Sequence, residues 1–436
     1  MRSSRLPEAG VLLLCLSSPA SSRTWTVGGP GADFTEIRAA ARRAEHGDLI
    51  LVNPGMYQAF ELSVGATVKA VSSPFMAPSV WIHGIVAGQR AAVSGMILEA
   101  GPTAGWSALI QDCEGEVLLE SVEVRDPFGF ERTRLFVADT LSLTITDMRM
   151  QAGGTVFGIA HASVWLERSR VRMSEIEIEG IQGVGGGSGF DGERGGPAIK
   201  LVDSHLVLSR PRIRGGKGGD IDFGCGFQGI AGDGGPGILA QGSDVIVLGS
   251  GDDYVEGGAG GNSGRCDNYF AGDGGAGYDG DRGLVSRVRV SGGEAGQGPF
   301  GDDGPEVIGQ LTRDDRLPSL TMSGPLQQGS RPSILVHASA QALVIPVLSD
   351  TSTDRSAPEL LGPPVAVMRG GLYRRLPAVL TQPDGNTLIS FHLPQATELD
   401  GFPLHVQALV LPQGGPPMIT NASSRIVGAS VQAATP

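Results

Sequence analysis

The segment Ser174-Glu175-Ile176-Glu177-Ile178-Glu179-Gly180 decides the fold, because its pattern returns at several places in the chain. Close copies are Ser209-Arg210-Pro211-Arg212-Ile213-Arg214-Gly215 and Ser286-Arg287-Val288-Arg289-Val290-Ser291-Gly292, and looser copies cover residues 120–124 and 146–150. Apolar and polar residues alternate in each copy, as they do in a β-strand with one buried face. The pattern therefore predicts one type of strand that is used repeatedly.

The spacing of the copies predicts that these strands stack as the turns of a coil. They begin at residues 120, 146, 174, 209, 251 and 286, at intervals of 26, 28, 35, 42 and 35 residues. Periods of about 20 to 50 residues are typical of repeats that bury their apolar faces against one another. The long intervals contain glycine-rich insertions, and each insertion follows the same type of strand.

Stacking in register would place equivalent outward positions side by side. The columns expected from the alignment are Glu175, Arg210, Asp252 and Arg287; Glu177, Arg212, Tyr254 and Arg289; and Glu179, Arg214 and Glu256. Like charges directly opposite each other destabilise a sheet, so the alternation of charge is what correct register requires. Each exposed pair contributes only about 0.2–1 kcal/mol, so we expect the columns to specify register more than stability.

Glycine dominates the second half of the predicted coil. Residues 181–304 hold 39 of the 68 glycines, without the strict Gly-X-Y period of collagen. Apolar runs such as Ile199-Lys200-Leu201-Val202 and Val245-Ile246-Val247-Leu248 interrupt the glycines, which argues against a disordered linker. We therefore expect ordered strands with glycine-rich loops between them.

The N-terminal part predicts a strand, a short helix and a second strand. Trp25-Thr26-Val27 is strand-like, and Phe34, Ile37, Ala41 and Ala44 would lie on one face of a helix. Asp33 or Thr35 is expected to cap the start of this helix and Gly47 to end it. A buried strand at 49–52 and a Pro-Gly turn at 54–55 complete the segment.

This opening resembles that of pectin-lyase-like right-handed parallel β-helix proteins, in which such a helix covers the open end of the coil. The resemblance implies an all-β fold, with a right-handed parallel β-helix over residues 23–310, an N-terminal capping helix and glycine-rich loop insertions at about 181–304. The alternative is the βαβ start of a Rossmann-like domain. The lack of further predicted helices argues against it.

Residues 1–22 have the organisation of a secretory signal peptide. Arg2 and Arg5 precede the apolar run 11–16, and the small residues 18–22 follow it. The apolar run is far shorter than the about 20 residues that span a membrane, and no later segment is apolar enough to do so. We therefore expect a protein that does not span the membrane and is secreted or displayed at the cell surface.

A second domain is predicted over residues 317–436, because glycine thins out near Leu317 and apolar runs separated by turns take over. These runs are Ile334-Leu335-Val336, 342–348, 388–391 and 404–410. Short apolar strands between turn residues are typical of a small antiparallel β-sandwich. Such a module either attaches the protein to a surface or caps the coil.

The net charge of the chain argues against nucleic acid as a binding partner. A net charge of −13 makes nucleic acid an unlikely ligand, because acidic surfaces repel phosphate backbones.

Cys225 and Cys266 precede the matching segments 231–235 and 271–275, so they occupy equivalent points of adjacent turns. Such points lie about one strand spacing apart, within disulfide reach. A Cys225–Cys266 disulfide is therefore predicted, with Cys113 unpaired.

Candidate catalytic residues are few. His83 lies in Val80-Trp81-Ile82-His83, which resembles a lyase strand but lacks the aspartate expected before the histidine, and Arg210 and Arg212 are explained by the strand pattern. Asp252-Asp253 and Asp302-Asp303 resemble the paired carboxylates of glycoside hydrolases, yet neither pair has the other residues of that pattern. The catalytic residues, if there are any, therefore stay unknown.

The segment 249–262 resembles a calcium-binding nonapeptide repeat, which makes Asp252 and Asp253 candidate calcium ligands. Only one and a half copies are present, whereas such sites need several in succession. No other cofactor is expected.

The sequence favours a non-enzymatic structural, adhesive or glycan-binding role, with polysaccharide or cell-envelope and matrix components as partners. The alternative is a polysaccharide lyase or glycoside hydrolase.

Overall fold

The computed structural model describes residues 22–99, 106–125, 134–151, 161–186, 191–221, 229–263, 269–323, 326–349, 353–354, 366–367, 373–394 and 399–428. The chain divides into two compact units between Asp315 and Arg316. Nearly all of the predicted signal peptide lies outside the described residues, and so do Cys225 and Cys266. No helix in the described ranges is long and apolar enough to cross a membrane.

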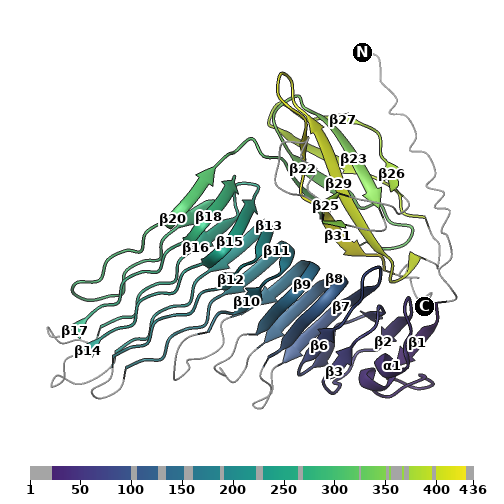
Figure 1. The fold of residues 1–436 in the computed structure, drawn as a ribbon, viewed down its shortest axis with the longest axis horizontal. Coiled ribbons are helices and arrows are strands. Elements are labelled where there is room, and N and C mark those ends of the chain that lie inside the picture. The colour runs from purple at the N-terminus through teal and green to yellow at the C-terminus, as the bar shows by residue number, and fades with distance from the viewer. Residues whose placement is uncertain are drawn as a thin grey trace, which may run out of the picture. The chain divides into compact units, whose positions relative to one another are not determined.

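Strands and one short helix are the regular elements of the first unit (Figure 1). Its elements are β1 (Thr24–Val27), α1 (Ile37–Arg43), β2 (Leu49–Val52), β3 (Phe60–Leu62), β4 (Thr67–Ala70), β5 (Phe75–Ala77), β6 (Val80–His83), β7 (Arg90–Glu99), β8 (Ala108–Arg125), β9 (Leu135–Met150), β10 (Val164–Glu167), β11 (Arg170–Glu179), β12 (Ile199–Val202), β13 (His205–Arg214), β14 (Gly229–Ile230), β15 (Ile238–Leu248), β16 (Tyr254–Glu256), β17 (Tyr269–Phe270), β18 (Tyr278–Ser286), β19 (Arg289–Ser291) and β20 (Val307–Arg313).

These strands pair in parallel with the strands one turn before and one turn after them. β11, for example, pairs with β9 on one side and with β13 on the other. The inward side chains form one continuous apolar core that extends from Val27 to Val290. The predicted stacking of repeated strands is therefore confirmed at the level of an all-β unit with a large parallel sheet.

Bends in the strands recur at equivalent points of successive turns. Two series of residues with side chains adopt the left-handed backbone conformation: Asp112, Asp139, Arg168 and Asp203, and then Ser121, Asp147, Glu175, Arg210 and Arg287. Such a conformation is costly for a residue with a Cβ, and aspartate tolerates it better than most. Repetition at each turn keeps the strands in register through the bend.

A polar ladder runs through the buried interior. Thr140, Ser169 and Ser204 each follow a bend of the first series by one residue, Ser243 follows Gly242 (φ +60°) in the same way, and all four are buried. The backbone N–H of Thr140 donates to Ser169 Oγ (3.1 Å), that of Ser169 to Ser204 Oγ (3.1 Å), and that of Ser204 to Ser243 Oγ (3.0 Å). The ladder satisfies buried N–H groups that would otherwise lack a partner.

The predicted helix is present, but its predicted caps are wrong. α1 begins after Glu36, which makes no side-chain capping bond, and it ends before Ala44. The Asp33 carboxylate instead accepts hydrogen bonds from the backbone and the hydroxyl of Thr26 (both 2.8 Å). Gly47 adopts φ +90° in the turn before β2. A cap was expected from spacing alone, which does not account for the competing bond to Thr26.

The register confirms the second and third of the predicted charge columns, whereas in the first column it pairs Asp252 with neither Arg210 nor Arg287. Glu177 pairs with Arg212, Arg212 with Tyr254, and Tyr254 with Arg289. Arg210 and Glu175 form an ion pair (3.1 Å), and so do Arg214 and Glu256 (2.9 Å). On its other side Glu177 pairs with Arg149, which pairs with Glu123, so the alternation begins two turns before the close copies of the strand.

The described parts of the glycine-rich insertions, which were predicted as loops, are ordered by backbone hydrogen bonds between neighbouring segments. Figure 1 shows them as extended segments that run out from the strands and return side by side. The outgoing segments are 180–186, 215–221, 257–263 and 292–297, and the returning segments are 192–197, 229–237, 269–277 and 299–305. Gly180, Gly183 and Gly186 donate to the carbonyls of Arg214, Lys217 and Asp220 (2.8–2.9 Å). Bonding at every third residue is the repeat of a polyproline-II-like helix.

The outgoing and returning segments form two hydrogen-bonded layers. Gly219 N–H donates to the Glu193 carbonyl of a returning segment (2.8 Å), and Gly232 N–H donates in turn to the Gly219 carbonyl (2.9 Å). A Cβ on Gly219 would lie 1.8 Å from the carbonyl oxygen of Val184. Glycine is therefore required because the backbones of neighbouring segments touch, and the backbone bonds that satisfy both layers replace side-chain packing.

The second unit contains antiparallel sheets. Its strands are β21 (Ser319–Ser323), β22 (Ser333–His337), β23 (Leu343–Ser349), β24 (Thr353–Asp354), β25 (Ala366–Val367), β26 (Tyr373–Arg375), β27 (Val379–Leu380), β28 (Asn386–Ser390), β29 (Pro403–Leu411), β30 (Met418–Ile419) and β31 (Ser423–Ile426). The sheet of β21, β22 and β28 and the sheet around β23 and β29 share one apolar core.

Candidate functional site

One outward row on the first unit is apolar where water-facing positions of a strand are normally polar. The register aligns Trp81, Leu109, Phe136, Trp165, Lys200, Leu239, Asp279 and Ile308 across successive turns. We call these residues the outward row. Trp81 is 38% and Ile308 46% exposed, so apolar surface is left in contact with water at both ends. Exposed apolar strips of this kind mark binding surfaces more often than isolated apolar residues do.

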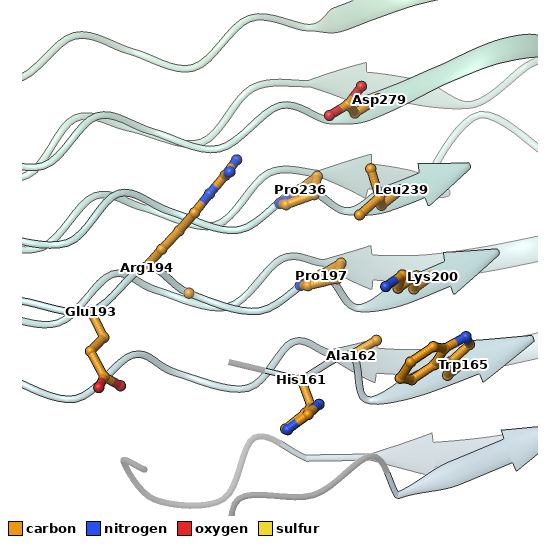
Figure 2. Close-up of a pocket in the computed structure, with 11 residues that line it drawn as sticks. His161, Ala162, Trp165, Glu193, Arg194, Pro197, Lys200, Pro236, Leu239 and Asp279 are labelled. Atoms are coloured by element: carbon orange, nitrogen blue, oxygen red, sulfur yellow. The ribbon is translucent and has the colours of Figure 1, made fainter. Parts of the chain in front are cut away.

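A groove of about 760 Å³ lies beside the middle of the outward row (Figure 2). Strands β10, β12, β15 and β18 supply Trp165, Lys200, Leu239 and Asp279. The returning glycine segments supply Glu193, Arg194, Pro197 and Pro236, and His161 and Ala162 precede β10. The groove therefore lies where the returning layer joins the strands.

The prolines of the groove lie on adjacent turns because the returning segments are in register. Ala198 N–H donates to the Pro236 carbonyl (3.2 Å), which places Pro197 beside Pro236. Figure 2 shows the two rings between the strand residues and the charged residues of the returning segment. Proline fits here because it has no backbone N–H group that would need a hydrogen-bond acceptor. The two rings give the groove a rigid apolar lining.

Aromatic contacts hold the wall of the groove. Trp106 stacks on Phe136 at 4.8 Å between ring centroids, and Phe136 meets Trp165 edge-on at 5.7 Å. Lys200 Nζ lies 4.4 Å from the centroid of the Trp165 ring. A cation held over an aromatic face is attracted by the ring quadrupole, so the side chain of Lys200 is positioned rather than free in solution.

The charged groups lie on both sides of the apolar lining. Arg194 is exposed, and its Nε is 3.5 Å from the carbonyl of Gly234. Figure 2 shows Arg194 extending towards the next turn while Glu193 points the opposite way. Asp279 lies on the turn beyond Leu239. Apolar rings together with a few fixed donors and acceptors are what binds the hydroxyl groups and C–H faces of sugars.

The residues singled out from sequence lie elsewhere. His83 is outside the groove, with Nε2 2.6 Å from Glu61 Oε1. Asp302 N–H donates to Asp273 Oδ1 (2.9 Å), and Asp303 Oδ1 accepts the N–H of Ala295 (2.9 Å). Arg210 and Arg212 belong to the charge columns. The structure does not bring these candidates together.

The two calcium candidates differ in their surroundings. Asp253 is buried, and its Oδ2 accepts hydrogen bonds from the backbone (2.6 Å) and the hydroxyl (2.9 Å) of Ser250. Asp252 is exposed. Within the described ranges, no group of three or more histidine, cysteine, aspartate or glutamate side chains is arranged to hold a metal ion. Calcium binding by Asp252 and Asp253 stays a prediction.

Sequence reasoning missed Trp165, Lys200 and Arg194. Trp165 and Lys200 occupy the second, water-facing position of Val164–Glu167 and Ile199–Val202, where an aromatic residue is unexpected. The aromatic side chain of Trp165 at a water-facing position was the signal in the sequence that could have indicated this site. Their proximity was hidden because a glycine-rich insertion separates the two strands in sequence.

Comparisons with known proteins add little to this geometry. No protein-family model and no curated protein matches the chain. Among solved structures, the chain is similar to tailspike protein 2 from Escherichia coli O157:H7 bacteriophage CAB120, with 9% sequence identity and a TM-score of 0.23. The similarity covers 96% of this chain and 69% of that chain. Because it is so low, it says nothing of what this chain binds, and membership of the pectin-lyase-like family stays a prediction.

Proposed function

We propose that the protein is a non-enzymatic, extracellular glycan-binding protein, in which a right-handed parallel β-helix carries the binding groove and a C-terminal β-sandwich follows. The observation that carries the proposal is the groove itself. Trp165, Leu239 and two proline rings line it, and charged side chains lie at its edges. Polysaccharides offer the matching chemistry, since each sugar has apolar C–H faces and polar edges.

The rigidity of the support favours binding as the role. Strands β10, β12 and β15 are joined by parallel pairing, and the returning segments are joined by backbone bonds along their length. A site held on such elements needs little ordering when the ligand arrives, so less of the interaction energy is lost as conformational entropy.

The test is co-sedimentation and calorimetry with xylan, cellulose, chitin, alginate and polygalacturonate. We expect the wild-type chain to bind at least one of them and Trp165→Ala to weaken that binding by about tenfold, which corresponds to about 1.4 kcal/mol. Phe300→Ala is the matched control, because Phe300 is an aromatic residue that is 77% exposed and lies outside the groove. Absence of binding throughout, or equal loss in both variants, would contradict the proposal.

The alternative is a carbohydrate-active enzyme that uses the same groove. Two carboxylates, Glu193 and Asp279, line it, and carboxylates are the usual acid and base of glycoside hydrolysis. The binding assays distinguish the two roles when the supernatant is also analysed for reducing ends and for unsaturated products. Product release that is lost in Glu193→Gln or Asp279→Asn would replace the binding proposal with the enzymatic one.

A further inference from the structure

The outward row continues beyond the groove to a second cluster of exposed side chains. Trp81 lies on β6, three turns before Trp165, and Leu109 and Phe136 occupy the same position on the turns between. All three turns belong to one parallel sheet, so the spacing of the row is fixed by backbone bonding at about 4.8 Å per turn. Trp81 and Trp165 are therefore held about 14 Å apart along the coil.

The Trp81 cluster has the same chemical character as the groove. The ring of His83 stacks on Trp81 at 4.1 Å between centroids, with an interplanar angle of 27°. Glu61, one turn earlier, lies 2.6 Å from His83 Nε2. An exposed indole ring thus lies next to an exposed carboxylate, which can accept hydrogen bonds from sugar hydroxyls, and next to an imidazole whose Nε2 is paired with that carboxylate.

The surface between the two places is apolar. Leu109 and Phe136 are only half-buried, and Trp106 packs against Phe136. The adjacent outward row is more polar, with His83, Gln111 and Glu167 at matching positions and Ala138 on the turn between Gln111 and Glu167. An apolar track with polar groups along one edge suits a ligand that repeats, since each turn then offers similar contacts.

We infer that Trp81 and His83, with Glu61, form a second sugar-binding subsite, and that the ligand is an internal stretch of a polysaccharide lying across the turns from Trp81 to the groove. The inference rests on the proposed function, because it extends the ligand bound at Trp165. An end-on ligand, or a free mono- or disaccharide, would fill the groove and leave Trp81 unused.

The test uses whichever polysaccharide of the panel binds, together with its oligosaccharide fragments from disaccharides upwards, on the full chain. We expect affinity to rise with fragment length until a fragment spans the about 14 Å from Trp81 to Trp165. Trp81→Ala should weaken binding of the polymer by about tenfold, or about 1.4 kcal/mol, and leave the shortest fragments unaffected. Trp81→Phe keeps a ring at this position and should retain most of the affinity.

The outcomes separate the two proposals. If Trp165→Ala weakens binding but Trp81→Ala does not, or if affinity is independent of length, the second subsite is wrong and the groove stands. If neither variant weakens binding, the groove is not the binding site and both proposals are wrong. Phe300→Ala controls for loss of an exposed aromatic residue, and unchanged melting temperatures show that the variants are folded.

Discussion

At the scale of single residues, the first unit is held together by groups that repeat from turn to turn. The ladder through Ser169, Ser204 and Ser243 gives each buried N–H an acceptor from the next turn. Cys113 lies in the same position one turn before Thr140, and its thiol donates to the Gln111 carbonyl (3.2 Å). Burial raises the pKa of the Cys113 thiol, so this cysteine behaves as a structural residue and not as a nucleophile.

Asp48 provides the clearest prediction of pH dependence. Burial alone would raise the pKa of this carboxyl, but hydrogen bonds from the backbone of Glu45 and Arg23 and from the indole of Trp25 outweigh it and hold the pKa below its ordinary value. The folded protein therefore prefers the ionised form. The stability that this preference supplies is complete above the unfolded pKa of about 3.9 and is lost as the pH falls through the folded pKa.

We therefore expect Asp48→Asn to lower the melting temperature at pH 7, and the difference from wild type to shrink as the pH falls below about 4. Urea unfolding of both proteins across this range measures the effect. Asp252→Asn is a suitable control, because it makes the same chemical change at an exposed side chain. A difference that stays constant down to pH 3 would show that the ionised form of Asp48 is not preferred.

At the scale of elements, strands were predictable and the glycine segments were not. Alternation over residues 174–180 is a local signal, and one buried face is enough to produce it. The order of the glycine segments arises from backbone bonds to segments about 20 to 40 residues away, such as Gly235 to Gly216 and Gly258 to Gly235. The alternation of apolar and polar side chains does not indicate such backbone bonds, so the glycine-rich segments were predicted as loops.

Glycine-to-alanine substitution tests whether the two layers exist. Gly219→Ala places a Cβ against the Val184 carbonyl, and we expect it to cost about 2 to 3 kcal/mol of unfolding free energy, as overpacking of an interior does. Ala259→Ser is the matched control, because Ala259 lies on an outgoing segment with its side chain half-exposed. If both substitutions cost the same small amount, glycine is there for flexibility and the layers are wrong.

The predicted Cys225–Cys266 disulfide gains support from the register of its flanks, although both cysteines lie outside the described residues. Ile221 N–H donates to the Asn262 carbonyl (2.9 Å), and Gly229 pairs with Tyr269. The cysteines each follow a bonded residue of this register by four positions. Closing a loop of about 40 residues would stabilise the chain by roughly 4 kcal/mol in the chain-entropy model.

Thiol counting tests the pairing. After unfolding without reductant, a chain that lacks residues 1–22 should show one reactive thiol, and peptide mapping should assign it to Cys113. After reduction, three should react. Three reactive thiols before reduction, or label on Cys225 or Cys266, would mean that the predicted disulfide is absent.

At the scale of the whole molecule, sequence placed the change of architecture between residues 310 and 317, and the two compact units divide between Asp315 and Arg316. It did not find the groove. Trp165 and Arg194 lie on different turns, and only the register of the strands and returning segments brings their surroundings together. Of the aspartate pairs that attracted attention in the sequence, the carboxylates of Asp253 and Asp303 accept hydrogen bonds from backbone N–H groups.

A crystal structure of the chain with the longest fragment that binds tests the central claim most directly. We predict sugar density over Pro197 and Pro236, next to Trp165, that continues across the turns towards Trp81. Density confined to another face of the first unit, or found only on the second unit, would contradict the assignment of the groove as the binding site.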